Sequence, residues 1–463
     1  MKKGLTGMTT LTAHLAYNEM RVERRNILHS QYPNYAIIQL TLAIPEPYKN
    51  SFSAQQLFYK GIESIHQKIP SLCHEQIYYD PDGPSGLFVS SANALHLKEI
   101  SSQIEENSPY SRLLDIDIYA NNKKAVSLLS RRQGRTCFLC QERAVTCMRN
   151  HTHTRNEILQ KVQELLLDFQ VELLCNQTSE TAKKISALAV RSLLYEAASY
   201  PSPGLVDPLH PGSHSDMDFF TFLNSSASLS SYFANFYDAG LQFATSKQEL
   251  FPLLKKIGLL AESAMYSSTE KINTHKGIIF SMGLVLGTIG YMKRLQLPIN
   301  SLSILRTVPQ ILPPLSKDFF QPSSCASAGI QAFKEFKIKG VRGEAAAGFP
   351  SVVNQGLPTL KKALVKGKPL RLALIQTLFA LMTTVDDTTI LHRQPHLETL
   401  HWVQNTAKKA LHENIFDTPD WQEKIWAIDK QFVKLNISPG GSADMLSLTY
   451  FLYLLDTQSA LLD

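Results

Sequence analysis

One change in the spacing of apolar residues constrains this fold more than any other feature of the chain. Residues 35–44 form an apolar run that ends at Pro45, as a strand does, because proline cannot extend a ladder. From residue 155 onward, apolar side chains recur at helical spacing. A chain of 463 residues is also too long for one core. We therefore expect two domains, an N-terminal α/β domain over residues 1–175 and a larger all-α domain over residues 176–463.

The expected elements follow from the same two periodicities. In the first domain we expect strands at 35–44, 77–79, 87–89 and 113–119, and helices at 11–30, 53–69 and 93–104. In the second we expect helices at 180–199, 229–243, 247–265, 276–293, 358–382, 397–413, 419–434 and 442–456. Asn176 to Ser179 supplies capping residues for the first of these and places the boundary near 170–178. The Pro- and Ser-containing stretch 298–327 is interpreted as a surface connection.

Composition argues against several classes of function. The net charge of +6 is modest and no basic tail is visible, so we expect anionic ligands such as nucleotides and no nucleic-acid partner. No segment reaches the roughly 20 apolar residues that span a bilayer, and no apolar signal follows Lys2 and Lys3, so we expect no membrane partner. Six cysteines in such a chain indicate a reducing, cytoplasmic compartment, where clustered cysteines bind metal or carry chemistry.

Two aspartates stand two residues apart in the strand expected at 113–119. Because side chains alternate between the faces of a strand, Asp115 and Asp117 share one face and the apolar residues share the other. Two carboxylates so close repel each other unless a cation or a proton lies between them, and Mg²⁺ prefers such oxygen ligands together with nucleotide phosphates. The pair therefore predicts a catalytic magnesium site. The alternative is an edge strand with a solvated polar face.

A group of cysteines and histidines follows this strand. The spacing Cys-x2-Cys-x6-Cys-x3-His can close a tetrahedral zinc site. Its four ligands would be Cys137, Cys140, Cys147 and His151. The alternative is a set of reduced cysteines beside an arginine-rich turn. Arginines of this region suit phosphate contacts, and the candidates are Arg112, Arg131 and Arg135.

The same region carries a specific combination of motifs. These are Arg112 to Tyr119, Ser130-Arg131, Gly134-Arg135-x-Cys137-x-x-Cys140, Ala144, Cys147-x-Arg149 and His151. With them, residues 10–170 resemble the citrate lyase holo-acyl-carrier-protein synthase, also called apo-citrate lyase phosphoribosyl-dephospho-CoA transferase. The resemblance implies a nucleotidyltransferase-like α/β domain. It also implies that a serine of the citrate lyase acyl carrier protein attacks a nucleotide-like phosphate while pyrophosphate leaves, and the two aspartates fit that chemistry.

Five polar blocks punctuate the helical domain, and one site assembled from several helix ends explains them together. We number them in chain order: 212–218, 273–277, 340–344, 386–388 and 438–444. Lys276 opens a helix, whose N-terminus favours an anion, and Arg342 suits phosphate. The expected phosphate- and substrate-binding residues are His214, Asn273, His275, Lys276, Arg342, Gly440, Gly441 and Ser442.

Carboxylates make up the rest of this expected site. The catalytic candidates are Asp216, Asp218 and Glu344, and the magnesium candidates are Asp207, Asp386, Asp387 and Asp444. A carboxylate pair directly after an apolar helix is costly without a partner, which favours a bound cation there. Helix capping is the commonest alternative role for one of the first block's aspartates, and Asp444 could serve as a partner of the helix dipole.

The matching segments are 200–207, 212–218, 273–277, 342–350 and 438–444, and with them nearly all of 180–460 resembles the triphosphoribosyl-dephospho-CoA synthase family. The resemblance implies that the 2′-hydroxyl of 3′-dephospho-CoA attacks the anomeric carbon of ATP and that adenine leaves, with magnesium on the triphosphate. Carboxylates would stabilise the oxocarbenium-like state. The whole chain thus resembles a fusion of two transferases whose partners are ATP, dephospho-CoA and the acyl carrier protein.

Two other functions remain open at this point. A metal-dependent ribosyl hydrolase would use water in place of the sugar hydroxyl. A zinc-binding nucleic-acid module fused to a helical interaction domain is compatible with the basic residues around 137–153, although the scattered aspartates argue against it.

Overall fold

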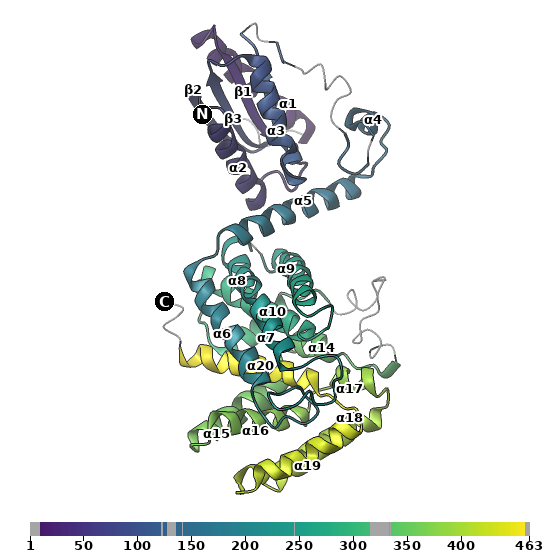
Figure 1. Ribbon diagram of the computed structural model, residues 1–463. Coiled ribbons are helices and arrows are strands. Elements are labelled where there is room, and N and C mark those ends of the chain that lie inside the picture. Colours follow the sequence, from purple (N-terminus) through teal and green to yellow (C-terminus); the bar gives the residue numbers. More distant parts are fainter. Residues whose placement is uncertain are drawn as a thin grey trace. The chain divides into compact units, whose positions relative to one another are not determined.

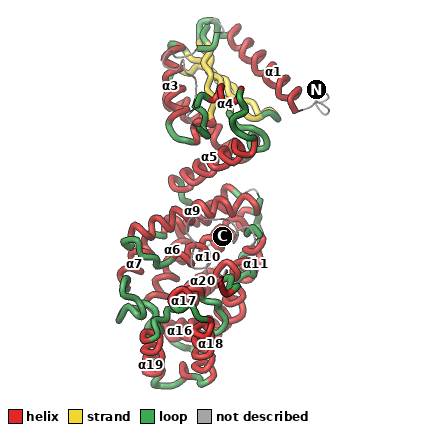
Figure 2. The backbone as a smooth tube through the Cα atoms, turned by 90° about the vertical axis from the view of Figure 1, so that its right-hand side faces the viewer, coloured by secondary structure: helices red, strands yellow, loops and turns green. Residues whose placement is uncertain are grey.

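The computed structural model describes residues 10–121, 124–126, 136–140, 142–244, 246–314, 333 and 335–458. The chain divides into two compact units, Met1–Glu172 (unit 1) and Leu173–Asp463 (unit 2), and the division falls within helix α5 (Arg155–Asn176). Within the described residues, named strands are confined to unit 1, and unit 2 is helical (Figure 2). None of the described helices is long and apolar enough to cross a membrane.

Unit 1 is built on a four-stranded antiparallel sheet with the order β2-β3-β1-β4 (Figure 1). The strands are β1 (Ala36–Leu42), β2 (Leu72–Asp80), β3 (Gly83–Ser90) and β4 (Leu114–Tyr119). The helices are α1 (Thr10–Gln31), α2 (Phe52–Lys68), α3 (Ala94–Glu106), the 3₁₀ helix η1 (Tyr110–Leu113), α4 (Ala144–Arg149) and the first part of α5. All four expected strands are present, and β2 extends further back than its apolar part predicts.

Helices cover both faces of this sheet. Gly61 of α2 lies against the side chains of Leu40 and Leu114, so α2 packs on the face to which Leu40 points. Leu28 of α1 packs against Ile37, and because residues 37 and 40 point to opposite faces of β1, α1 covers the other face. The face under α1 is the one that carries the functional candidates of unit 1.

Unit 2 is a helical domain. Its α-helices are α6 (Glu180–Ala197), α7 (Phe219–Ser228), α8 (Ser230–Asp238), α9 (Lys247–Ser268), α10 (Lys276–Arg294), α11 (Ser301–Thr307), α14 (Gly340–Ala346), α15 (Leu357–Val365), α16 (Leu370–Met382), α17 (Thr388–Arg393), α18 (Leu397–His412), α19 (Trp421–Lys434) and α20 (Gly440–Thr457). Shorter 3₁₀ and π segments are η3 (Ala239–Phe243), η4 (Val308–Gln310), η5 (Val352–Gly356) and η6 (Ile415–Asp417). Helices α10 and α20 are buried on nearly all sides and contact each other, and their apolar sequences reflect this position.

Two expectations for unit 2 were wrong. The single helix expected over 358–382 is broken between α15 and α16, because Gly367 adopts a left-handed φ of +77° and Pro369 precedes the next helix. The connection expected over 298–327 contains α11, which Asn300 caps through Ser303; residues 315–327 lie outside the described part. Ser179 caps α6 as expected, by accepting a hydrogen bond from the Ala182 amide.

Candidate functional sites

The two aspartates of β4 lie on the sheet face that α1 covers. Asp117 pairs in register with Gln39 and Asp115 with Thr41, and both carboxylate residues are partly exposed while the apolar residues between them are buried. The alternation expected from the sequence is therefore confirmed. Thr41 Oγ1 donates a hydrogen bond of 3.4 Å to Asp115 Oδ2. The face thus presents two carboxylates and a hydroxyl in a row.

Arginine side chains of α1 add positive charge to the same face. The Arg25 guanidinium donates to Gln39 Oε1 over 2.8 Å and lies 3.7 Å from the centre of the Tyr119 ring. Arg21 is buried and pairs with Asp82 at 2.7 Å, beside the β2–β3 turn. Cationic groups next to paired carboxylates suit a ligand that carries both phosphate and a metal ion.

Arg112 does not lie on this face. From η1 its guanidinium donates to the backbone carbonyl of Thr136 and, over 3.0 Å, to Thr136 Oγ1. Arg112 thus links η1 to the cysteine segment, and the phosphate role expected for it stays a prediction. Arg131 and Arg135 lie outside the described residues.

Sequence reasoning missed two α3 side chains that fix the outer edge of β4. Glu105 is buried and its carboxylate accepts the Ile116 amide over 2.7 Å, while Lys98 Nζ donates to the Ile116 carbonyl over 2.8 Å. These bonds replace a neighbouring strand and hold the aspartates in register. The sequence did offer one signal for Glu105: at helical spacing it falls on the same face of α3 as the buried residues Leu97 and Ile104.

The cysteine group gathers around a different histidine from the expected one. Cys137, Cys140, Cys147 and His153 each place one ligand atom within 4.8 Å of the others. His151 is exposed and adopts a left-handed φ of +47° just after Asn150, the C-cap of α4, so the chain turns there. The histidine two residues later is the one that reaches the thiols. The fourth member of the group is thus His153, which corrects the expectation of His151.

The five polar blocks of unit 2 meet in one region. His214 of the first block lies with Nε2 2.9 Å from Ser438 Oγ of the fifth. Asp387 of the fourth block accepts the amides of Gly441 (3.1 Å) and Ser442 (2.8 Å) of the fifth.

The second and third blocks join this region as well. Gly277 of the second block lies so close to Asp444 of the fifth that an added Cβ would come within 2.0 Å of Asp444 Oδ2. Burial raises the pKa of Glu344 in the third block, and the negative charge of Asp386 in the fourth adds to this effect. The blocks that the sequence separates by more than two hundred residues are therefore neighbours in space.

A pocket of about 480 Å³ opens beside the first block. Carboxylates of Asp216, Asp218 and Glu270 line it together with hydroxyl and amide groups of α7 and of the end of α9. The Asp216 side chain is 59% exposed, and its Oδ1 lies 3.8 Å from His214 Nδ1. Such an open, acidic pocket can hold a cation together with a polar ligand.

His214 is fixed as a neutral imidazole at the edge of this pocket. Burial, assisted by the positive charge of Arg393, lowers the pKa of His214 to about 4. Arg393 donates to Nδ1 over 2.8 Å, so the proton of the neutral ring is on Nε2 and is donated to Ser438. Arg393, which sequence reasoning did not select, therefore sets the orientation of His214.

Several expected phosphate-binding groups have structural roles instead. The Gly441 and Ser442 amides donate to Asp387, so the glycine-rich 440–442 turn already holds a carboxylate in place of a phosphate. His275 is buried, its Nδ1 lies 2.6 Å from Ser225 Oγ, and burial lowers its pKa to about 3, so it carries no charge for a phosphate. Asn273 Oδ1 accepts the amide of Lys276, the first residue of α10, over 3.2 Å.

The charged groups expected beside them are also engaged. Lys276 forms a 2.8 Å ion pair with Glu262 of α9, and Arg342 of α14 is near enough to act on the pKa of Lys276. Asp218 caps α7 in a capping box with Thr221. Glu344 accepts the amide and the hydroxyl of Ser351.

The four expected magnesium ligands do not gather as a set of three or more in the described residues, although Asp387 is close enough to act on the pKa of Asp444. Among the residues that the structure describes, three or more His, Cys, Asp or Glu ligand atoms gather at the cysteine group and nowhere else. Asp207 is buried and accepts the amides of Leu209 and His210, Asp387 caps two helices, and Asp386 is exposed. Asp444 is buried, and burial together with the charges of Glu196 and Asp387 raises its pKa well above the ordinary value.

Two further ionisable groups near these blocks were missed. Glu196, at the end of α6, is buried, and burial raises its pKa to about 8. Asp429 of α19 accepts the Gly204 amide over 2.9 Å and lies 3.3 Å from His210 Nε2. Both residues lie on apolar faces of their helices. A single acidic residue on such a face was the only feature of the sequence that could have identified them.

Comparison with known proteins places both units among transferases. Residues 182–462 match the family described as ATP:dephospho-CoA triphosphoribosyl transferase, and residues 9–169 match the family described as apo-citrate lyase phosphoribosyl-dephospho-CoA transferase. The chain is thus a bifunctional transferase. It belongs to the CitXG family, in which these two transferases are fused.

Relatives match along the whole chain and along unit 2. The protein CitXG of Leuconostoc mesenteroides is 32% identical over 94% of this chain and 94% of its own length. The protein CitXG of Haemophilus influenzae is 32% identical over 96% of this chain and 95% of its own length. A probable 2-(5''-triphosphoribosyl)-3'-dephosphocoenzyme-A synthase of Streptococcus mutans is 38% identical over 60% of this chain and 98% of its own length.

Proposed function

We propose that unit 2 transfers the triphosphoribosyl group of ATP to the 2′-hydroxyl of 3′-dephospho-CoA and releases adenine. The family match of residues 182–462 supports this reaction. The observation that carries it in the structure is the open acidic pocket beside the first polar block, which His214 joins to the fifth block. Departure of adenine leaves positive charge on the anomeric carbon, which a carboxylate stabilises while it takes the hydroxyl proton.

We propose Asp216 as that carboxylate. It is exposed at the pocket, whereas Asp218 and Asp387 are engaged as caps. Asp216 Oδ1 lies 3.8 Å from Nδ1 of His214, which burial and the charge of Arg393 keep neutral. Magnesium on a triphosphate needs one or two protein carboxylates, so Asp216 fits that role too, and the ion would neutralise phosphate charge.

We propose that unit 1, acting in a nucleotidyltransferase-like manner, moves the phosphoribosyl-dephospho-CoA group of this product to a serine of the citrate lyase acyl carrier protein and releases pyrophosphate. The family match of residues 9–169 supports this step. Asp115 and Asp117 fit magnesium, because they offer two partly exposed oxygen ligands on one face beside Arg25. When bound, the ion would offset charge on the attacked phosphate and on pyrophosphate. The chain itself would hold Asp115, Asp117 and Arg25 in fixed positions on one face of the sheet.

Mass analysis of nucleotide products tests both halves in the full-length chain. With ATP, dephospho-CoA and magnesium, Asp216→Asn is expected to stop precursor synthesis but still to load the carrier protein from supplied precursor. Asp117→Asn is expected to do the reverse. Asp218→Asn, the matched control, should keep synthesis and change stability little, because asparagine caps a helix about as well as aspartate does. Loss of both activities in either of the first two variants would refute the division, and adenine release without dephospho-CoA would indicate a hydrolase.

A further inference from the structure

We propose that unit 1 holds one structural zinc ion through Cys137, Cys140, Cys147 and His153. With Zn–S bonds of about 2.3 Å, tetrahedral geometry separates two sulfur ligands by roughly 3.8 Å. In the structure the Cys140 and Cys147 sulfurs are 3.4 Å apart, and His153 Nε2 lies 3.3 Å from the Cys140 sulfur. All four ligand atoms lie within 4.8 Å of one another, so one ion can reach them all.

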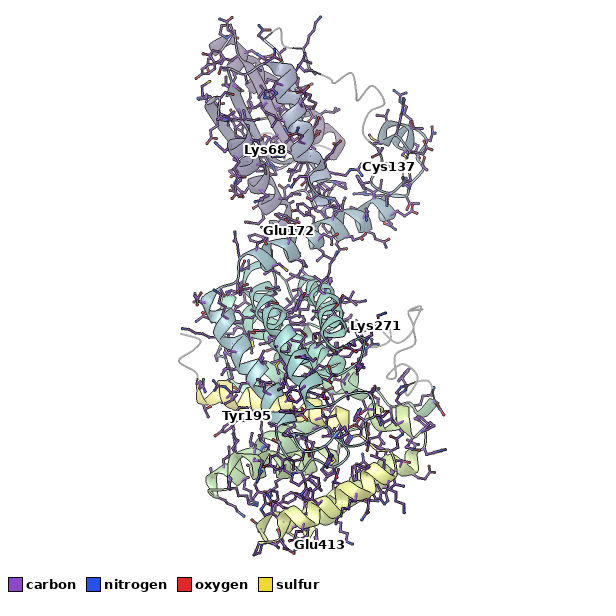
Figure 3. The ribbon with its side chains drawn as sticks, in the orientation of Figure 1. Lys68, Cys137, Glu172, Tyr195, Lys271 and Glu413 are labelled. Carbon is purple, nitrogen blue, oxygen red and sulfur yellow. The ribbon has the colours of Figure 1, made fainter. Side chains whose placement is uncertain are left out.

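The backbone around the first two cysteines suits metal-bound sulfur. The Leu139 amide donates to Cys137 Sγ over 3.4 Å. Such bonds stabilise the negative charge of a coordinated thiolate and fix its direction. The Cys137 amide in turn donates to the Glu142 carbonyl over 2.7 Å, which closes a tight hairpin behind the ligands. Cys137 is labelled in Figure 3, on the segment that leads into α4.

The described residues of this segment bury little apolar surface in α4. Helix α4 contains six residues, and Cys147 is the one that it buries. His153 stands in the short connection from α4 to α5. An ion that joins the hairpin, α4 and this connection supplies the folding energy that so small an apolar contact cannot. The cysteines are free, and the Cys140 and Cys147 sulfurs, 3.4 Å apart, are not joined in a disulfide bond.

Four protein ligands fill the tetrahedron and leave no position for water, which is the arrangement of structural zinc. The set also distinguishes two histidines of almost the same sequence position. His153 is a ligand, and His151 is an exposed residue of the preceding turn. Arg112 connects the ligand segment to the 3₁₀ helix that precedes β4. If unit 1 loads the carrier protein as proposed above, loss of zinc should therefore also slow that reaction.

Metal analysis of the full-length chain, purified under reducing conditions after growth with zinc, tests the proposal directly. We expect about one zinc per chain in the parent protein and in His151→Ala. His153→Ala and Cys140→Ser should weaken binding by more than the roughly 10–100-fold cost of losing an outer-shell partner. His153→Cys should retain the metal, because thiolate can replace imidazole. Replacement by Co²⁺ should give the strong visible absorption of a tetrahedral, sulfur-rich site, with more sulfur-to-metal charge transfer in His153→Cys.

Hydrogen exchange supplies a readout that is independent of both activities. Amides of residues 136–155 should lose protection on chelation and in His153→Ala, while those of unit 2 should not change. A parent protein with less than a tenth of a zinc per chain that also fails to bind Co²⁺ would overturn the proposal. So would loss of zinc in His151→Ala together with its retention in His153→Ala. Retained zinc with failed carrier loading would count against the proposed function of unit 1 and leave the zinc site standing.

Discussion

Asp387 was expected to bind magnesium, and the structure gives it a different task that can be measured. Its carboxylate accepts the Thr389 amide at the start of α17 and the Gly441 and Ser442 amides at the start of α20. One buried side chain therefore caps two helices. Asp387→Ala should leave the Thr389 and Ser442 amides without this partner, while the Gly441 amide keeps its 3.1 Å bond to Thr389 Oγ1. Ser442 is itself buried, so water cannot easily replace the carboxylate there.

The expected cost follows from these bonds. Loss of a capping side chain costs roughly 0.5–2 kcal/mol per helix, and a buried donor left unpaired costs roughly 1–3 kcal/mol. These figures overlap, because the same amides count in both, and we expect a loss of about 3 kcal/mol for unit 2. In a domain of this size each kcal/mol lowers the unfolding midpoint by roughly 2–4 °C, so the shift should be roughly 6–12 °C.

Tryptophan fluorescence of the intact chain isolates this transition. The three tryptophans of the chain, Trp402, Trp421 and Trp426, all belong to unit 2, so unfolding of unit 1 adds little to the signal. Asp386→Ala is the matched control, since Asp386 is the exposed neighbour and should change stability by less than about 0.5 kcal/mol. An Asp387→Ala protein that unfolds like its parent yet fails to make the precursor would refute the capping role and restore a ligand-binding one.

Two other perturbations of unit 2 have expected outcomes in the same assay. Gly277→Ala should lower the stability of unit 2 by about 1–3 kcal/mol, because the new Cβ would meet the Asp444 carboxylate. Gly258→Ala, whose nearest new contact lies at 3.9 Å, should be neutral or stabilising. Equal effects of the two substitutions would contradict the packing argument. Glu196 has a pKa raised to about 8, so its contribution to stability is complete below its ordinary pKa and is lost as pH rises through about 8. The stability of unit 2 should therefore fall as pH rises from about 4.5 to about 8, and Glu196→Gln should flatten that slope. Buried His275 has its pKa lowered to about 3, so its contribution to stability is lost only as pH falls below its ordinary pKa. An unchanged slope in Glu196→Gln would assign the effect to another group.

The sequence was a good guide wherever one local rule decided the outcome. Alternation placed Asp115 and Asp117 on one face, and turn and cap residues such as Ser179 marked element ends correctly. It was a poor guide to which polar groups remain available to a ligand. Gly441 and Ser442 have the composition of a phosphate cradle, but their amides bind Asp387, which is some fifty residues away in sequence.

Helix capping and anion binding use the same backbone amides, so composition at a helix start cannot separate them. The partner decides, and the partner is a matter of tertiary structure. Where a carboxylate of the chain reaches the amides, as Asp387 does at α20, the helix start is structural and no longer attracts phosphate. Where a carboxylate is left at an open pocket, as Asp216 is, its charge remains available to a cation or to a developing positive centre. By this criterion, most acidic residues of unit 2 hold the fold together, and a smaller set can act on substrate. The two substitutions should therefore affect different properties. Asp216→Asn should reduce precursor synthesis without changing stability, and Asp387→Ala should reduce stability before it reduces synthesis.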